Sequence, residues 1–451
     1  LLLAPTDPAT TRRRPPPRPK LTVATTFPIW PPMGGGQARI FHLYKNLARH
    51  FDVDIVSYGQ GSSDAFEAEI APGVNEIRIA KSEAHAEREQ ALMDALGGRP
   101  IGDIAAHLLS PFTPDYRRAL EASALASCAV IASHPYLADD IKAVAPGKPF
   151  WYEAHNVEID LKQAVLDGQA QARPILDMVR AVEGRCWREA SQVFACTARD
   201  LDALGALFGP TRAILHEVPN GVALDEIAFI GPERRRSLQE TSGLGARRTA
   251  IFIGSWHGPN LEAVEAILAA APTLPELRFI VAGSACMPFR GHAIPGNVDM
   301  LGQVDAATRD ALLAAADIAL NPMRTGSGTN LKMLDYFAAG IPVLSTSFGA
   351  RGLKAEAGRH YLAADGELAA ALREAFGDAE RLAAMPAAAR ALVEADYGWD
   401  VIAERFARSL ARAGFPVPGL PDSEDQSDQA SSQDRLASKR RRTRRPSGNG
   451  E

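Results

Sequence analysis

The sequence has few cysteines and lacks the long apolar runs that define membrane-spanning proteins. Only four cysteines occur in 451 residues, at positions 128, 186, 196 and 286, and no two form a Cys-x-x-Cys pair. Scattered thiols of this kind favour a reducing compartment over a disulfide framework or a zinc site. No run of about 18 apolar residues is present, so the sequence predicts no transmembrane helix.

The chain also lacks an excess of positive charge. Its net charge of -5 gives no reason to expect nucleic acid as a partner. With 46% hydrophobic and 23% charged residues, the composition is typical of a globular protein. A chain of 451 residues is too long for one ordinary hydrophobic core, so two domains are expected.

Both ends of the chain are predicted to be disordered and are excluded from the predicted fold. In segment 1–19 the charged residues follow a very short apolar stretch, which does not match a secretory signal peptide. Segment 414–451 is rich in polar residues and ends in a basic cluster at 439–445. A solvated tail in a cytoplasmic protein is the favoured interpretation, and peripheral contact with anionic lipid at the inner membrane face is the alternative.

Strand and helix patterns alternate between these ends. In the first half, strands are expected at 21–27, 53–57, 76–80, 130–133, 150–153, 193–196 and 214–218. In the second half, they are expected at 250–254, 277–282, 298–301, 317–320 and 343–345. Helical spacing of apolar residues separates many of them, which favours parallel sheets with ligands at the carboxyl ends of the strands. The sequence therefore predicts an α/β protein with two Rossmann-like domains.

Four regions carry more specific expectations. Residues 81–127 are predicted to be mostly helical, and residues 159–190 to form one long helix with a kink at Pro174. Residues 226–248 are polar and poorly periodic, so they are expected to be an irregular link between the domains. Residues 366–395 are predicted to be helical with breaks near Gly377 and Pro386.

Residues 321–346 contain a glycine loop between two predicted strands. The loop carries Gly326 and Gly328, and a short helix is expected to begin near Asn330. Gly340 is placed to end that helix in the left-handed conformation. Strand, glycine loop, helix and strand together are typical of a ligand-binding edge of a parallel sheet.

Lys332 lies in the first turn of this helix, where a cation meets the positive end of the helix dipole. That placement is unfavourable by roughly 0.3–1 kcal/mol. It makes sense if a phosphate lies between Lys332 and the N–H groups of Gly328, Thr329 and Asn330. Asp335, one turn further on, would then suit the ribose hydroxyls of a nucleotide. The alternative is a Lys332–Asp335 surface pair on an ordinary helix, and the loop alone does not decide between them.

The first half has weaker signals. Gly34, Gly35 and Gly36 follow the first strand, but they do not form the GxGxxG pattern of dinucleotide folds. His155 follows the strand at 150–153, and taken alone it is best interpreted as a strand-end histidine bonded to the backbone. Trp256, in the loop after the first strand of the second half, is expected to pack rather than stack on a ligand.

Taken together, these motifs resemble the GT-B glycosyltransferases, and in particular the retaining, nucleotide-sugar-dependent family four. The resemblance rests on the GGG loop, AHNVE at 154–158, VPNGV at 218–222, IFIGSWHGPNLEAVEAI at 251–267 and GSGTNLKMLDYFAAGIPVLST at 326–346. It covers residues 20–413. It implies an acceptor domain at 20–222, a donor domain at 223–395, and a helix at 396–413 that crosses back to the first domain.

The resemblance also implies site residues. His155 would face the transferred sugar, and His155 and Lys332 would be the catalytic residues. Ser327 stands where the family has a glutamate, and Ser255 stands among residues that replace its usual Arg and Lys. The implied donor-binding residues are Gly35, Gly36, Ser255, Arg324, Ser327, Gly328, Thr329, Asn330, Lys332 and Asp335.

The implied reaction moves a sugar from a nucleotide-sugar donor to a hydroxyl of a glycan, lipid-linked or small-molecule acceptor. It proceeds with retention, and the departing phosphate takes the acceptor proton. No metal is expected, and no cofactor beyond the donor substrate is expected. The alternatives are a GT-B epimerase of sugar nucleotides, an inactive binding module suggested by Ser327, and an inverting transferase with His155 or a first-domain carboxylate as base.

Overall fold

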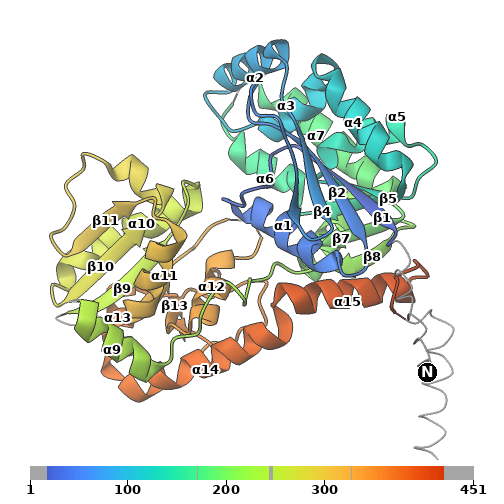
Figure 1. Ribbon diagram of the computed structural model, residues 1–451. Helices are drawn as coiled ribbons and strands as arrows, with labels where there is room; N and C mark the ends of the chain where they lie inside the picture. The colour runs from blue at the N-terminus through green and yellow to red at the C-terminus, as the bar shows by residue number, and fades with distance from the viewer. Residues whose placement is uncertain (1–17, 170, 243–246, 327, 421–451) are drawn as a thin grey trace, which may run out of the picture.

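The protein forms two α/β domains, each built around one sheet (Figure 1). The computed structural model describes residues 18–169, 171–242, 247–326 and 328–420. The basic cluster at 439–445 lies outside these residues, so membrane contact through it stays a prediction. Within the described residues, no helix has both the length and the apolar character needed to cross a membrane.

The first sheet has eight strands in the order β3-β4-β2-β1-β5-β6-β7-β8, and the pair β3–β4 is antiparallel while the other pairs are parallel. Its strands are β1 (Lys20–Thr25), β2 (Asp52–Tyr58), β3 (Phe66–Ala71), β4 (Val74–Ile79), β5 (Ser127–Ser133), β6 (Phe150–Ala154), β7 (Gln192–Ala195) and β8 (Ile214–Glu217). The helices of this domain are α1 (Gly35–Leu47), α2 (Glu83–Ala95), α3 (Gly102–Leu109), α4 (Pro114–Leu125), α5 (Ala138–Val144), α6 (Glu158–Val165), α7 (Ala172–Glu189) and α8 (Ala198–Phe208).

The second sheet has six strands in the order β11-β10-β9-β12-β13-β14, and all its pairs are parallel. Its strands are β9 (Arg248–Ile253), β10 (Leu277–Ala282), β11 (Val298–Gly302), β12 (Ile318–Asn321), β13 (Val343–Ser345) and β14 (Leu362–Ala363). The remaining helices are α9 (Pro232–Ser242), α10 (Gly258–Ala270), α11 (Ala306–Ala315), α12 (Leu331–Ala339), α13 (Leu368–Gly377), α14 (Ala379–Asp396) and α15 (Trp399–Arg412). Two sheets in which all pairs but β3–β4 are parallel confirm the predicted pair of Rossmann-like domains.

Alternating residues along the central strands supply both faces of the first sheet. Leu21 and Val23 of β1 pack with α1 and α15 on one face, whereas Ala24 packs with α3, α4 and α7 on the other. Strands buried on both faces become nearly continuous apolar runs. In the second sheet, α10 and α13 cover one face, and α11, α12 and α14 cover the other.

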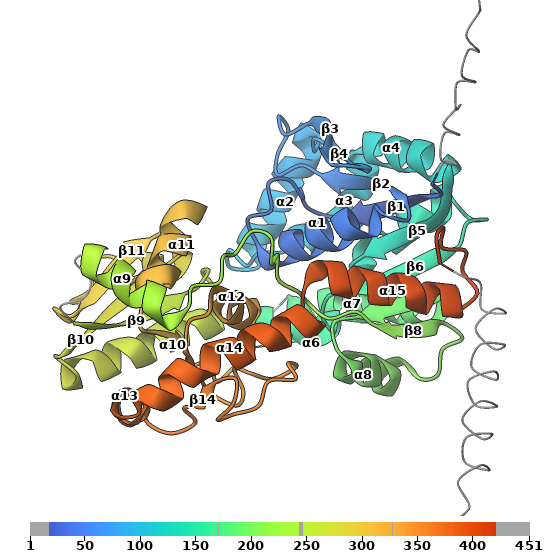
Figure 2. The same cartoon turned by 60° about the horizontal axis from the view of Figure 1, so that its bottom comes forward.

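Helix α15 belongs to the core of the first domain although it follows the second domain in the chain. Figure 2 shows it lying beside α1 and across the first sheet, in line with α14. Trp399 stacks on His42 with ring centroids 6.2 Å apart, and Phe406 lies 4.7 Å from the Phe194 ring. Helix α15 therefore ties the two domains together.

Three local predictions were wrong. The helix expected at 159–190 is two helices, because the chain leaves α6 after Val165 and turns at Gly168, whose φ is 73°. Pro174 lies in the first turn of α7, where its missing N–H is tolerated. Pro386 is buried inside α14 and does not break it, so tertiary packing decides the helix there.

The link predicted to be irregular contains α9. Its anchor is Arg235, a buried side chain whose guanidinium donates to carbonyls at the ends of two other helices, including those of Ala316 and Gly340. Helix carboxyl ends carry partial negative charge, so a cation is stabilised there. The spacing of apolar residues does not indicate this helix, because an arginine makes its main contact.

Candidate functional site

The two domains touch where the glycine loop of the first meets the start of α12 in the second. A methyl group on Gly35 would lie only 2.9 Å from Leu331 Cδ1, so the absence of a side chain permits this approach. A methyl group on Gly328 would lie 3.5 Å from Asn156 Oδ1. Nearby, Asn220 Nδ2 donates to Thr329 Oγ1 over 2.8 Å. The structure thus brings the glycine loop, the 154–158 loop and the 322–330 loop together.

His155 follows β6 and is buried at this contact. Its Nε2 lies 2.9 Å from Ser133 Oγ and 3.5 Å from Glu153 Oε1, and its ring centroid lies 4.0 Å from that of His134. Its Nδ1 is on the side of Gly36, where a methyl group would lie 3.9 Å away. Burial and the neighbouring His134 ring lower the pKa of His155 to about 3, so the imidazole is neutral at physiological pH.

A buried ion pair supports His155. Arg39 of α1 donates from Nε to Glu153 Oε1 over 3.0 Å, and Tyr44 donates to Glu153 Oε2 over 3.0 Å. Burial alone would raise the pKa of Glu153, but His155 and Arg39 outweigh it and lower the pKa to about 2. The Arg39 Nη1 also donates to Asn220 Oδ1 over 3.1 Å. A hydrogen-bonded chain therefore runs from Glu153 through Arg39 and Asn220 to Thr329.

Sequence reasoning missed this network. The available signals were a glutamate inside an otherwise buried strand and an arginine among the apolar residues of α1. Neither signal identifies the partner, because Arg39 and Glu153 are 114 positions apart in the chain.

Lys332 is held under the loop that follows β9. Its Nζ donates to Asn260 Oδ1 over 2.6 Å and lies 4.4 Å from the centroid of the Phe252 ring. Burial lowers the pKa of Lys332 to about 7. The alternative of a Lys332–Asp335 surface pair is wrong, since Lys332 makes its contact with Asn260 instead.

Asp335 is influenced by charged residues of α11. Burial raises its pKa to about 6, and the charges that act on it most are those of Arg309 and Asp310 on α11. No described residue donates a hydrogen bond to its carboxylate. A ligand with hydroxyl groups would find an unoccupied acceptor there.

The other predicted donor-binding residues make separate contacts in and around the 322–330 loop. The Arg324 guanidinium donates to the carbonyls of Asp365 and Gly366, so the structure does not bring its charge to Lys332. Asn330 donates to Gly349 O over 2.9 Å, and Ser255 O accepts from Asn260 over 2.9 Å. Ser327 lies outside the described residues.

A pocket of about 1160 Å³ opens between the domains beside this contact. Loop 97–100, residues 156 and 157, α6 and α8 line it from the first domain. The lining from the second domain consists of the loop after β9, the start of α10, and residues 325, 326, 328, 348, 351 and 352. Gly328 is in the lining, whereas His155, Lys332 and Asp335 are not. Trp256 was expected to pack, but it is 62% exposed on the pocket wall.

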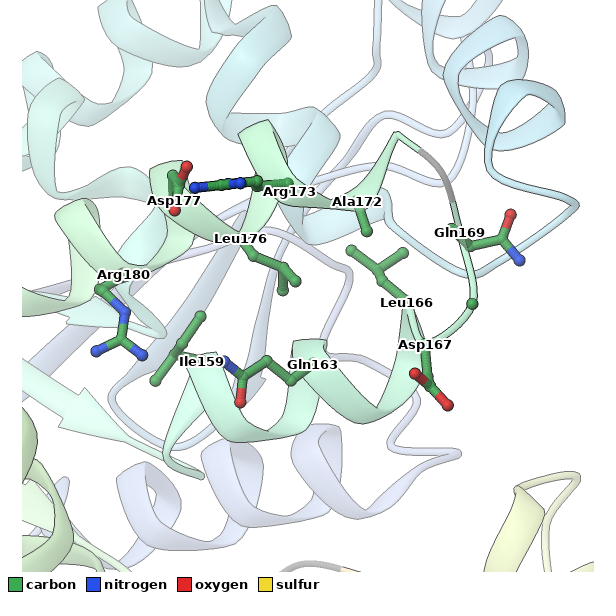
Figure 3. A pocket seen from close by; sticks show the side chains of 11 residues that line it. Ile159, Gln163, Leu166, Asp167, Gln169, Ala172, Arg173, Leu176, Asp177 and Arg180 are labelled. Carbon is green, nitrogen blue, oxygen red and sulfur yellow. The ribbon is translucent and has the colours of Figure 1, made fainter.

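A smaller pocket of about 490 Å³ lies between α6 and α7. Ile159, Leu166 and Leu176 give it an apolar floor, and Arg173, Asp177 and Arg180 lie at its polar side (Figure 3). Helix α6 lines both pockets, but none of the predicted site residues lines the smaller one.

Possible metal ligands were also considered. In the parts of the chain that the structure describes, no three or more His, Cys, Asp or Glu side chains gather in a way that could hold a metal ion.

Comparison with known proteins finds a family match within the second domain. The family described as "Glycosyl transferases group 1" matches residues 247–378. A Corynebacterium glutamicum GDP-mannose-dependent monoacylated alpha-(1-6)-phosphatidylinositol monomannoside mannosyltransferase is 30% identical over 45% of this chain and 57% of its own length. A Mycobacterium tuberculosis glycogen synthase is 26% identical over 54% of this chain and 60% of its own length. This chain thus spans less than two thirds of either relative.

Solved structures resemble the chain over most of its length. A sucrose-phosphate synthase from Thermosynechococcus elongatus has a TM-score of 0.68 and 16% identity, covering 87% of this chain and 98% of its own. Anabaena HepE in complex with UDP and glucose has a TM-score of 0.62 and 13% identity, covering 86% and 99%. The chain therefore has the GT-B fold, and residues 247–378 in its second domain match the family of group 1 glycosyl transferases.

Proposed function

We propose that this protein is a glycosyltransferase that moves a sugar from a nucleotide-sugar donor to an acceptor hydroxyl. The observation that carries the proposal is the meeting of the glycine loop, His155 and the start of α12 at one contact between two Rossmann-like domains. Parallel α/β sheets bind ligands at the carboxyl ends of their strands, and these loops all follow such ends. The family of the second domain and the GT-B fold support the same reaction.

The donor diphosphate would bind at the free N–H groups before α12, with Lys332 beside it. An anion there would restore full positive charge to Lys332, because a nearby opposite charge raises the pKa of an amine. Asp335 would accept hydrogen bonds from the ribose hydroxyls. Charge developing on the leaving phosphate would be stabilised without a metal ion.

His155 would position the transferred sugar. A histidine with a pKa of about 3 is a poor general base at neutral pH, since its conjugate acid is too strong to hold the acceptor proton. We therefore assign that proton to the departing phosphate, which leads to retention of the anomeric configuration.

The donors of similar proteins indicate where to begin a test. One relative is named for GDP-mannose, and one structural neighbour binds UDP and glucose. We expect the full chain, incubated with radiolabelled GDP- and UDP-sugars and a mixed panel of glycans, glycolipids and small sugars, to release free nucleotide and label an acceptor in the presence of EDTA. A changed sugar on an intact nucleotide would indicate an epimerase. Neither product with any donor would favour a binding module, and an inverted product would exclude retention.

Substituting Lys332 by Met is expected to raise stability and lower donor affinity. The lysine binds its proton less tightly in the folded chain than in the unfolded chain, whose value is 10.5. The unfolded state therefore holds more protons between pH 7 and 10.5, and wild-type stability rises with pH across that window. At pH 6 the variant avoids burying an ammonium, a gain of about 1–3 kcal/mol after the lost contacts with Asn260 and Phe252 are subtracted.

The measurement is thermal unfolding at pH 6 and 9, together with titration of the nucleoside diphosphate. We expect at least tenfold weaker diphosphate binding, which corresponds to about 1.4 kcal/mol. The matched control is Lys354→Met, at an exposed lysine paired with Asp396. Unchanged diphosphate affinity in Lys332→Met would show that Lys332 does not contact the donor.

A further inference from the structure

A serine and a glutamate on neighbouring strands meet the Nε2 side of the His155 ring. Ser133 is the last residue of β5 and is paired with Glu153 of β6. The Ser133 Oγ lies 2.9 Å from His155 Nε2 and 3.1 Å from Glu153 Oε2, and all three side chains are buried. A hydroxyl has one proton, so Ser133 can donate to only one of these two neighbours.

Glu153 determines which neighbour receives that proton. Its Oε1 accepts from Arg39 Nε and its Oε2 accepts from the Tyr44 hydroxyl. Burial acts to raise the pKa of Glu153, but its neighbours outweigh burial and lower the pKa to about 2. The carboxylate is therefore ionised and can only accept, so Ser133 must donate to it. The Ser133 oxygen then accepts from His155, which places the ring proton on Nε2.

The other ring nitrogen of His155 is thereby left as a hydrogen-bond acceptor. In a neutral imidazole with its proton on Nε2, Nδ1 carries a free lone pair. This Nδ1 is on the side of Gly36, where a methyl group would lie 3.9 Å away. It bonds to no described residue, and unlike the Nδ1 of His134 it is not enclosed. The His134 ring, tilted by 31° with its centroid 4.0 Å from that of His155, holds the plane of the ring. Nδ1 is therefore a fixed acceptor beside the glycine loop.

We propose that Ser133 is a positioning residue that, together with Glu153, fixes His155 in the Nε2–H tautomer, so that Nδ1 accepts a hydrogen bond from a hydroxyl of the donor sugar. The tautomer follows from the contacts of the described residues, and the sugar contact rests on the proposed glycosyltransferase function. Ser133 acts through His155, because its own side chain is fully buried. A sugar that presents only acceptor atoms at this place, such as a carboxylate, would lose the hydrogen bond.

Substituting Glu153 by Gln should reverse the direction of these hydrogen bonds. Arg39 Nε donates at the place of Oε1, so the amide oxygen takes that place and the NH₂ group takes the place of Oε2. The NH₂ group then donates to Ser133, and the hydroxyl proton of Ser133 turns to His155 Nε2. The ring proton moves to Nδ1, which becomes a donor.

Nuclear magnetic resonance of the full chain with isotopically labelled histidine ring nitrogens measures the tautomer, because protonated and bare ring nitrogens differ in chemical shift. The signals of His155 are those that are absent from His155→Gln. Near neutral pH, we expect the wild-type ring to carry its proton on Nε2. In Glu153→Gln we expect the ratio of the Nδ1–H form to the Nε2–H form to rise about tenfold, because the hydrogen bond with Ser133 then favours the opposite tautomer.

Removing the hydroxyl then assigns the effect to Ser133. Ser133→Ala keeps the buried pair of Arg39 and Glu153, so it tests the hydroxyl even if Glu153→Gln does not fold. We expect its Nδ1–H fraction to rise about threefold, because Nε2–H loses its acceptor. The double variant Ser133→Ala/Glu153→Gln should match Ser133→Ala within about twofold, since the connecting hydroxyl is absent. Ser409→Ala is the matched control and should change only the signals of His216, whose Nδ1 lies 2.7 Å from the Ser409 hydroxyl. Thermal unfolding of each variant verifies that it is folded.

The sugar contact is tested by adding UDP-glucose and GDP-mannose to the wild-type chain, with UDP and GDP as controls. We expect at least one sugar nucleotide to move the His155 Nδ1 signal toward that of a hydrogen-bonded nitrogen, and the nucleoside diphosphates to leave it unchanged.

Three results would each overturn the proposal: a wild-type ring with its proton on Nδ1, a tautomer ratio that is unchanged in both Ser133→Ala and Glu153→Gln, or an Nδ1 signal that neither sugar nucleotide moves. The radiolabelled-donor assay separates such a failure from failure of the proposed function. Donor turnover beside any of these results refutes only the role of Ser133 and the Nδ1 contact, whereas a fixed Nε2–H tautomer without turnover of any donor counts against the glycosyltransferase function.

Discussion

Replacing Glu153 by Ala is expected to destabilise the first domain by about 3–5 kcal/mol. The carboxylate accepts from Arg39, Tyr44 and Ser133, and all of these groups are buried. Removing it leaves the Arg39 guanidinium as a buried charge without its counter-ion, and desolvated unpaired charges are among the most damaging changes in a protein interior. We expect the thermal midpoint of the first domain to fall by roughly 10 °C.

The same pair predicts a dependence on pH. The pKa of Glu153 is about 2 in the folded chain and 4.5 as an isolated group. Its contribution to stability, on the order of 3 kcal/mol, is therefore complete above pH 4.5 and is lost as the pH falls toward 2. We expect the wild-type chain to lose this contribution to the free energy of unfolding as the pH is lowered. The Glu153→Ala variant lacks the carboxylate, so its free energy of unfolding should not show this loss.

Denaturant unfolding at pH 7 and pH 3.5 makes the comparison. Glu394→Ala is the matched control, because Glu394 is a 54% exposed partner of Arg390 on α14 and exposed pairs contribute about 0–1 kcal/mol. Glu153→Gln should lie between the wild type and the Ala variant, since the amide keeps one acceptor but loses the charge. If Glu153→Ala unfolded within 1 kcal/mol of the control, the buried pair would not stabilise the domain.

The parts of this structure that the sequence predicted are those determined by local pattern. Alternating strands and helices gave both sheets, and Gly340 ends α12 with a φ of 69° as expected of a glycine at that position. These features depend on residues a few positions apart.

The parts that the sequence did not predict depend on distant partners. Lys332 was identified by its place in a helix, but its contact, Asn260, is 72 positions away and directs the amine under the β9 loop. Arg235 anchors α9 through carbonyls about 80 to 105 positions distant. The Arg39–Glu153 pair is the largest omission, since it supports His155, which alone looked like an ordinary strand-end histidine. Tertiary pairing decided the chemistry of these sites.

Replacing His155 by Ala is expected to lower kcat about 100-fold and leave the affinity for the nucleoside diphosphate within about threefold. The ring is fixed by Ser133 and Glu153 beside the glycine loop, so in the proposed reaction it orients the sugar and not the nucleotide. Because its pKa is about 3, wild-type kcat should show no ionisation of His155 between pH 5.5 and 8.5. Initial rates across this range, with saturating donor, provide the measurement.

A positioning role and general base catalysis by His155 predict different activities for the conservative variant His155→Gln. A glutamine at position 155 can present an amide N–H to a sugar hydroxyl, so His155→Gln should recover part of the activity lost in His155→Ala if the ring positions the sugar. A general base would leave both variants equally inactive and would add an acidic limb to the wild-type pH profile near its own pKa. An acidic limb near pH 6.5 that disappears in His155→Gln, together with an inverted product, would replace the positioning role by base catalysis. A flat profile with partial recovery and a retained product supports the role proposed for the neutral ring.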